Sequence, residues 1–306
     1  MKRILILRDK IPFSGREAIF EDFLRKHFKN KAEIKTERLT RVMIEMRPTK
    51  IKISFGEKDV RDYDLIWIRK PTTKFVNLAA ALGLCFDFLG VKYFDTSFGK
   101  RAVGGNKLLL LLNLAKNGLP IPQSFFLFRE ELPGYRQKII NQLGFPLVAK
   151  LMGVHWGKGV FVLRNEEEFN QFVKSRKKGQ LVFQRFHPHQ GDYRILVLGY
   201  QVWAWEKMWR ESDLAPQSVG GMHPVGDLKK KEFYPVSKIP PKMAKLAIKA
   251  ARAVSLEVAG VDILKDSHTG KYIMTEVNRT PAFATDYPGD PELKAVAYFL
   301  EKSLGL

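Results

Sequence analysis

Short apolar segments alternate with amphipathic helical segments along the first hundred residues, and this pattern constrains the fold more than any other feature. The expected strands cover residues 3–7, 64–70 and 91–95, and the expected helices cover residues 15–28 and 74–90. Gly90 closes the second helix in the manner typical of a C-terminal glycine cap. Because strands that alternate with helices form parallel sheets, we expect an amino-terminal α/β domain with a parallel sheet over residues 1–103.

The rest of the chain predicts a mixture of helices and strands, which makes the fold class α/β (α+β). The expected helices cover residues 107–118, 135–144, 165–176, 241–254 and the segment after Pro291. The expected strands cover residues 145–151, 159–164, 181–186, 193–199, 201–209, 258–264 and 271–278. Since 306 residues exceed what one small core accommodates, we expect two further subdomains, over residues 104–181 and 182–306.

The chain carries a large excess of positive charge. It has 52 Lys and Arg residues against 32 Asp and Glu, which gives a net charge of +20. Such a charge indicates an anionic partner, such as nucleic acid, a nucleotide, an acidic peptide or the ribosome surface. The basic residues are spread along the sequence, so a solvated Lys-rich surface is the alternative explanation. The sequence contains no RNA-recognition signature, zinc-finger spacing or basic tail.

The cysteine content and the hydropathy pattern favour a cytoplasmic location. Cys85 is the single cysteine of the sequence, which excludes an internal disulfide framework and suits a reducing compartment. The sequence has no run of eighteen apolar residues, so we expect no membrane span and no membrane partner. The first residues lack the cleavage site of a signal peptide and are better explained as a strand.

Three oxygen-bearing side chains lie in two neighbouring apolar segments. Asp262 lies in VAGVDIL, and Glu276 and Asn278 lie in KYIMTEVN, where residues two positions apart point to the same face of a strand. Acidic residues are rare in buried strands unless they are paired or bind a metal. The set therefore favours Mg²⁺, with a polar exposed strand face as the alternative. His187 and His189 lack an evident third ligand and are interpreted as loop histidines.

A glycine-rich turn over residues 153–159 joins two expected strands. Glycine lets the backbone turn tightly and point N–H groups at an anion, and Lys158 adds positive charge. Lys150, on the strand face opposite Ala149, and Lys107, at the start of a helix, carry the charge needed to neutralise phosphate oxygens. A plain β-turn and two surface lysines are the alternative explanation.

In chain order these pieces resemble the ATP-grasp fold: a lysine before a long helix, a lysine before a glycine turn, then LVFQRF, GVD and EVN. Within that superfamily they are most similar to the RimK-type and glutathione-synthetase-like ligases, and the similarity covers residues 104–290. The resemblance implies three subdomains. It also implies an enzyme that uses ATP and Mg²⁺, with Mn²⁺ as an alternative metal, in a fold that often forms homo-oligomers.

The resemblance assigns three groups of site residues. The nucleotide-binding group includes the phosphate lysines, the glycine loop, the adenine hinge and the ribose carboxylate. In that order its members are Lys107, Lys150, Gly157, Lys158, Gly159, Gln184, Arg185, Phe186 and Asp192. The catalytic group, which faces the phosphates or the acyl group, comprises Lys150 and Arg194. The metal-binding group comprises Asp262, Glu276 and Asn278.

The chain departs from the family pattern around the acceptor. RimK-like members usually have Glu in the hinge where this chain has Arg185. They also carry an Arg-x-Asn segment before a Gly-Gly pair, whereas LAPQSV precedes Gly220 and Gly221 here, with Lys207 or Arg210 as substitutes. The ATP and magnesium residues are retained, so the departures concern the acceptor substrate.

The resemblance therefore predicts an ATP-dependent carboxylate–amine ligase that forms a peptide bond through an acylphosphate intermediate. Its partners are a carboxylate substrate and an amine substrate, with an amino acid added to a peptide, a protein or a small carboxylate. An acidic protein or peptide acceptor suits the basic chain. Two alternatives stay open: a non-catalytic ATP-binding or ribosome- or RNA-binding module that retains the fold, and a kinase-like phosphotransferase.

Overall fold

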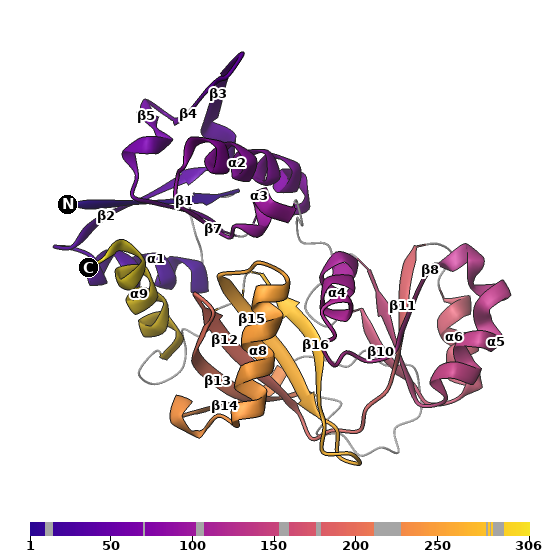
Figure 1. The fold of residues 1–306 in the computed structure, drawn as a ribbon. Coiled ribbons are helices and arrows are strands. Elements are labelled where there is room, and N and C mark those ends of the chain that lie inside the picture. The colour runs from indigo at the N-terminus through magenta and orange to yellow at the C-terminus, as the bar shows by residue number, and fades with distance from the viewer. Residues whose placement is uncertain are drawn as a thin grey trace.

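The computed structural model describes most of the chain. It covers residues 1–9, 15–69, 71–101, 107–152, 159–175, 179–210, 228–279, 281, 283 and 291–306. Figure 1 shows an amino-terminal α/β unit above a large antiparallel sheet, with a smaller antiparallel sheet to one side. Among the described residues, no helix combines the length and the apolar character that crossing a membrane requires.

The amino-terminal unit is built on a parallel sheet with strand order β2-β1-β6-β7. Its strands are β1 (Lys2–Arg8), β2 (Ala32–Arg38), β6 (Leu65–Ile68) and β7 (Tyr93–Phe94), and its helices are α1 (Arg16–His27), α2 (Val76–Leu89) and α3 (Ser97–Arg101). All four residues of β6 are buried, as expected for a parallel strand covered on both faces. Gly90 ends α2 with a φ of 66°. The predicted parallel sheet and its glycine cap are confirmed.

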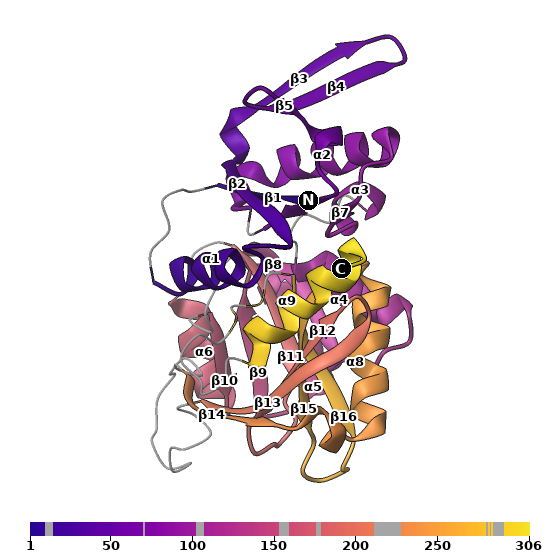
Figure 2. The ribbon, with the colours of Figure 1, turned by 90° about the vertical axis from the view of Figure 1, so that its left-hand side faces the viewer.

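A second sheet in this unit was not predicted. Strands β3 (Val42–Arg47), β4 (Lys50–Phe55) and β5 (Lys58–Asp59) form an antiparallel sheet, which projects away from the rest of the molecule (Figures 1 and 2). Thr49 takes a φ of 61° in the turn between β3 and β4. The root of the hairpin packs on the core of the unit through Ile53 and Phe55.

The central unit is an antiparallel sheet covered by helices on one face. Its strand order is β10-β9-β11-β8, with β8 (Ser124–Phe128), β9 (Leu147–Leu151), β10 (Val160–Leu163) and β11 (Gln180–Arg185). Helices α5 (Leu132–Leu143) and α6 (Glu166–Lys174) pack on one face around Phe169, Phe172 and Phe183. Because β11 spans the boundary expected at residue 182, we propose that this unit ends after Arg185.

The large sheet is antiparallel throughout, with strand order β14-β13-β12-β15-β16. Its strands are β12 (Asp192–Leu198), β13 (Gln201–Arg210), β14 (Leu228–Tyr234), β15 (Val258–Lys265) and β16 (Tyr272–Asn278). Helices α4 (Lys107–Lys116) and α8 (Pro241–Ala253) pack on one face, and α9 (Pro291–Leu304) packs on part of the other. The expected hairpin between β12 and β13 is confirmed, with positive φ at Gly199 and Tyr200.

Five single-turn 3₁₀ helices complete the described secondary structure: Leu39–Arg41, Val60–Asp62, Thr73–Phe75, Arg129–Glu131 and Val236–Lys238. Hydrogen bonds from main-chain N–H groups to side-chain carboxylates fix the amino-terminal unit on the large sheet. Asp95 accepts a hydrogen bond of 3.0 Å from the N–H of Val258, and Glu257 accepts one of 2.9 Å from the N–H of Thr96. These bonds hold the end of the parallel sheet beside β15.

Candidate active site

A row of charged residues crosses one face of the large sheet. Asp262 on β15 lies directly opposite Glu276 on β16 and opposite Arg194 on β12, and Arg194 in turn lies opposite Glu206 on β13. Directly opposed residues of antiparallel strands share a face of the sheet. The adjoining residues of each strand point to the other face, into the apolar core beneath α8. Strand alternation thus gathers the charges on the side away from α8.

Arg194 and Asp262 form a bidentate ion pair at the centre of this row. The guanidinium donates from Nε to Oδ1 and from Nη2 to Oδ2 of Asp262, each at 2.8 Å. Burial disfavours the charge of Arg194, but the carboxylate of Asp262 outweighs burial and raises the pKa of Arg194 above its ordinary value. The guanidinium therefore stays charged and fixed in direction.

The three predicted metal-binding residues lie together on two adjacent strands. Asn278 donates from Nδ2 to Oδ2 of Asp262 at 3.1 Å, and Glu276 lies opposite Asp262 in the ladder. Lys107, at the start of α4, places its Nζ atom 3.3 Å from Oε1 of Glu276. A phosphate-binding lysine predicted from one part of the chain thus contacts a metal-binding carboxylate predicted from another.

The donor set suits a magnesium ion. Two carboxylates and one amide supply hard oxygen atoms, which Mg²⁺ prefers over nitrogen and sulfur. Arg194 and Asn278 already bond to Asp262, but a carboxylate offers about four lone-pair positions and can accept further contacts. Among the described residues, no group of three or more His, Cys, Asp or Glu side chains could hold a metal ion. Mg²⁺ bound by these three residues would complete its coordination shell with water and phosphate oxygens.

Lys150 reaches the same region from the central sheet. It lies on β9 beside the half-buried Val148, whereas Ala149 faces the core beneath α5 and α6, as the sequence predicts. Burial lowers the pKa of Lys150, with Lys107 acting in the same direction and Glu276, Asp192 and Asp262 acting against it. Lys150 therefore lies within the electric field of the charged row. A shared anion between Lys107 and Lys150 would relieve their mutual repulsion.

The predicted adenine hinge connects the two antiparallel sheets. Gln184 is buried and donates to Oγ of Ser124 at 2.9 Å. The N–H of Arg185 donates to the carbonyl of Gln123 at 2.9 Å, and its side chain donates to Oε1 of Gln123 at 3.0 Å and to the carbonyl of Gln142 at 2.6 Å. The side chain of Arg185 therefore braces the hinge and points toward α5.

Phe186, His187 and His189 lie between β11 and β12, and Asp192 is the first residue of β12. His189 lies 6.3 Å from Phe186 between ring centroids, and its Nε2 lies 3.6 Å from Oδ1 of Asp192. The Nδ1 atom of His187 lies 2.8 Å from Oδ2 of Asp266. The interpretation of both histidines as loop residues is confirmed, because each is held by neighbouring polar groups.

Part of the predicted phosphate loop lies outside the described residues. Gly157 and Lys158 belong to that part. The separate Gly220-Gly221 pair of the acceptor segment also lies outside the described residues. Gly159 is described, and its carbonyl accepts a hydrogen bond of 2.8 Å from the N–H of Leu151. This bond continues the β9–β10 ladder toward the turn.

Glu206 lies in the charged row, opposite Arg194, and the sequence analysis did not single it out. It is buried on β13, and its Oε2 atom has no hydrogen-bond partner among the described residues. Burial is the main cause that raises the pKa of Glu206 to about 7. A glutamate between tryptophans in the strand QVWAWEKMW was the available signal, since acidic residues are rarely buried without a reason.

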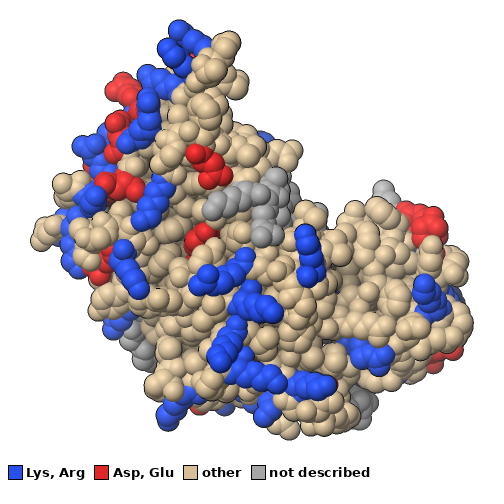
Figure 3. Space-filling view, viewed as in Figure 1, with Lys and Arg blue, Asp and Glu red and all other residues tan. Residues whose placement is uncertain are grey.

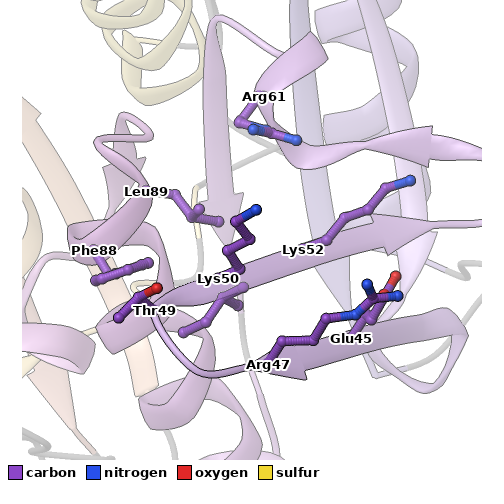
Figure 4. Close-up of a pocket in the computed structure, with 9 residues that line it drawn as sticks. Glu45, Arg47, Thr49, Lys50, Lys52, Arg61, Phe88 and Leu89 are labelled. Carbon is purple, nitrogen blue, oxygen red and sulfur yellow. The ribbon is translucent and has the colours of Figure 1, made fainter.

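A hollow of about 480 Å³ lies far from this row, beside the projecting hairpin. Figure 4 shows Lys50, Lys52 and Arg61 pointing into it, with Phe88 and Leu89 of α2 at one end. Arg47 and Glu45 also line it and form an ion pair at 2.7 Å. The hollow is basic and open, and it shares no residue with the charged row.

The fold and the site geometry define a class of protein, the ATP-grasp ligases. The family model for the RimK-like ATP-grasp domain matches residues 104–286, and the chain belongs to that family. It is an ATP-dependent carboxylate–amine ligase, as the sequence resemblance predicted. ATP-grasp ligases use ATP and Mg²⁺.

Relatives and solved structures agree with this assignment. A probable alpha-L-glutamate ligase of Trichodesmium erythraeum is 27% identical over 278 residues, which cover 87% of this chain and 86% of the relative. The ATP-grasp ligase PsnB, solved with a minimal precursor, Mg and ADP, superposes with a TM-score of 0.70 at 16% identity over 99% of this chain and 98% of that chain. The VanG D-Ala:D-Ser ligase of Enterococcus faecalis superposes with a TM-score of 0.66 at 14% identity over 100% and 99% of the two chains.

Proposed function

We propose that this ligase activates the carboxylate of an acidic peptide or protein as an acylphosphate and joins it to the amino group of an amino acid. The observation that carries the proposal is the charged row: Glu276, Asp262 and Arg194 on adjacent strands, with Lys107 at 3.3 Å from Glu276. Such a row offers a metal site, a phosphate site and a fixed guanidinium in one line.

The roles of the residues follow from their charges. Asp262, Glu276 and Asn278 would hold Mg²⁺, or Mn²⁺ in its place, and the metal would supply charge neutralisation at the phosphate oxygens. Lys107 and Lys150 bind the β- and γ-phosphates, and Arg194 stabilises the charge that develops between phosphate and acyl group. Phosphoryl transfer needs positioning and charge neutralisation more than a side-chain nucleophile.

The remaining predicted residues bind the rest of the nucleotide. We assign Gly157, Lys158 and Gly159 to the loop over the phosphates, and residues 184–186 to the adenine hinge. Asp192 lies near the ribose. The backbone N–H of Arg185 already bonds to Gln123, so the hinge contacts the base through the remaining backbone groups.

The reaction has two steps. A carboxylate oxygen of the acceptor attacks the γ-phosphorus, the bond between the γ-phosphorus and the bridging oxygen breaks, and ADP leaves with the electron pair. The amine then attacks the acyl carbon, a C–N bond forms, and phosphate leaves. The central sheet, closing over the row, excludes water that would hydrolyse the acylphosphate.

Several charged surfaces support an acidic acceptor. Figure 3 shows Lys and Arg gathered over the α8 face, where Lys242, Lys245, Lys249 and Arg252 are exposed. The hollow beside the hairpin adds two more basic side chains, Lys50 and Lys52, next to the apolar Phe88 and Leu89. Such fields attract anionic partners and speed their association. The similarity to a probable glutamate ligase favours L-glutamate as the amine. We further propose a cytoplasmic location, which the single cysteine favours, and a homo-oligomer, which the sequence resemblance implies.

The test is release of ADP from ATP and Mg²⁺ when a tetraglutamyl peptide and single amino acids are supplied, with the products identified by mass. A peptide that gains one amino acid residue supports the proposal, whereas a phosphorylated peptide indicates a kinase. If no pool of peptides, small carboxylates and amines raises ADP release above its background, the proposed reaction is wrong.

Binding of a polyanion such as RNA, in addition to the ligase activity, is the second candidate function, because helix α8 carries four exposed basic side chains and no acidic residue. The variant Glu276→Ala separates the two functions. Loss of turnover with retained RNA binding supports both, whereas absence of RNA binding in the wild-type protein rules out the second.

A further inference from the structure

Glu206 occupies a position that the proposed roles above leave unexplained. It is 5% exposed, on the site face of β13, directly opposite Arg194. Its Oε2 atom is enclosed without a hydrogen-bond donor among the described residues. Enclosing a carboxylate oxygen without a donor is costly, so a native carboxylate in this state requires a reason such as a ligand.

The charged groups that face Glu206 come from four elements. Arg194 on β12 and Lys231 on β14 lower its pKa, whereas Glu292 on α9 and Asp262 on β15 raise it. Burial is the largest cause, and the net result is a pKa of about 7. Glu292 is itself 3% exposed.

The order of the row gives Glu206 its place in the reaction. Neighbouring strands lie about 4.8 Å apart, so Glu206 is about 10 Å from Asp262 across the sheet and about 14 Å from Glu276. Arg194 lies between Glu206 and the metal-binding residues. If the phosphates lie over Asp262 and Glu276 and the acyl carbon lies over Arg194, the nucleophile approaches from the side of Glu206.

We infer that Glu206 binds the ammonium group of the incoming amine and accepts its proton before the amine attacks the acylphosphate. The inference rests on the proposed function and specifies the amine subsite of that reaction. An ammonium group would donate to the carboxylate of Glu206, which keeps 5% of its surface exposed on the site face of β13.

The proton balance is complete. The ammonium gives one proton to the Glu206 carboxylate and becomes a neutral amine with a free electron pair. That pair forms the C–N bond as the bond between the acyl carbon and the phosphate oxygen breaks, and the leaving phosphate takes the electron pair and a second amine proton. The third hydrogen stays on the amide nitrogen, and Glu206 returns its proton to water when the product leaves.

The experiment compares two nucleophiles in Glu206→Gln. Hydroxylamine is largely uncharged at neutral pH and converts an acylphosphate to a hydroxamate without an ammonium site. With ATP, Mg²⁺ and tetraglutamyl peptide, we expect Glu206→Gln to form hydroxamate within about twofold of wild type. With L-glutamate as the amine, we expect coupling to fall at least tenfold and to lose the decrease that wild type shows as pH falls below about 7.

Glu232→Gln is the matched control, because Glu232 lies on the adjacent strand β14 and is exposed beside the hydroxyl of Tyr234. It should leave both reactions unchanged. Equal loss of hydroxamate formation and glutamate coupling in Glu206→Gln would show a structural role and overturn the inference. Full glutamate coupling in that variant would overturn it as well. Absence of hydroxamate and ADP from the wild-type enzyme would overturn the proposed function, and the inference with it.

Discussion

The substitution Arg194→Lys tests the central ion pair most directly, because it keeps the positive charge and removes the planar fork. Wild-type Arg194 donates two hydrogen bonds of 2.8 Å to Asp262, whereas lysine presents a point charge and replaces one of them. A hydrogen bond to a charged group contributes about 1.5–3 kcal/mol. If the variant loses this energy in the transition state, its rate falls about 10- to 150-fold.

The assay is ADP release with tetraglutamyl peptide and L-glutamate, at saturating ATP and over a titration of Mg²⁺. We expect kcat to fall within that range, and the Mg²⁺ concentration for half-maximal rate to rise because Asp262 loses its fixed direction. Arg136→Lys is the control, since Arg136 also donates to two side chains, Glu166 and Asn170, on the outer face of the central sheet. If Arg194→Lys turns over at the wild-type rate with an unchanged Mg²⁺ requirement, the row does not act as described.

Three further predictions concern single residues. Glu276→Gln should raise the Mg²⁺ concentration for half-maximal ADP release about 10-fold or more, as measured in the same titration, since it removes a carboxylate ligand. Burial lowers the pKa of Lys150, so its charge is lost at a lower pH than that of an exposed lysine with a pKa of about 10.4. The KM for ATP should therefore rise with pH in the alkaline range, and Lys150→Arg should abolish that rise. Burial opposes the charge of Asp266, but hydrogen bonds from His187 and Thr269 outweigh it and lower the pKa of this carboxyl. The charge thus stabilises the fold above the unfolded value of about 3.9, and this stability is lost as pH falls below that value. Asp266→Asn should cost about 1–3 kcal/mol at pH 7, and thermal unfolding should show the difference shrinking in acid.

The sequence predicts the elements of the site well, because each carries a local signal. Asp262 stands out in a strand that is otherwise apolar, and the spacing of Glu276 and Asn278 places both on one strand face. The bidentate pair between Arg194 and Asp262 has no such signal, since 68 positions separate the two residues. The contact depends on the register between β12 and β15, which are neighbours in the sheet but far apart in the sequence.

The amino-terminal hairpin and β2 show where local patterns fail. The segment AEIKTER of β2 consists largely of residues that favour helices, but pairing with β1 along its whole length makes it a strand. In β3, VMIEMR mixes apolar and charged residues without a clean alternation, and most of its side chains are exposed. Tertiary pairing outweighed propensity in both strands.

The braced hinge has a mechanical consequence. The two chain segments that connect the central unit to the rest of the molecule are tied to the large sheet, through Pro120 to Met274 and through Pro188 to Ser267, each by a main-chain hydrogen bond of 2.7 Å. Arg185 then couples the two segments to each other through Gln123. We therefore predict that the central unit moves as one rigid body about one axis, and that the latch formed by Arg185 limits the rate of nucleotide exchange. Stopped-flow measurement of ADP dissociation in Arg185→Ala would detect a faster swing, and an unchanged dissociation rate would show that the latch sets no limit.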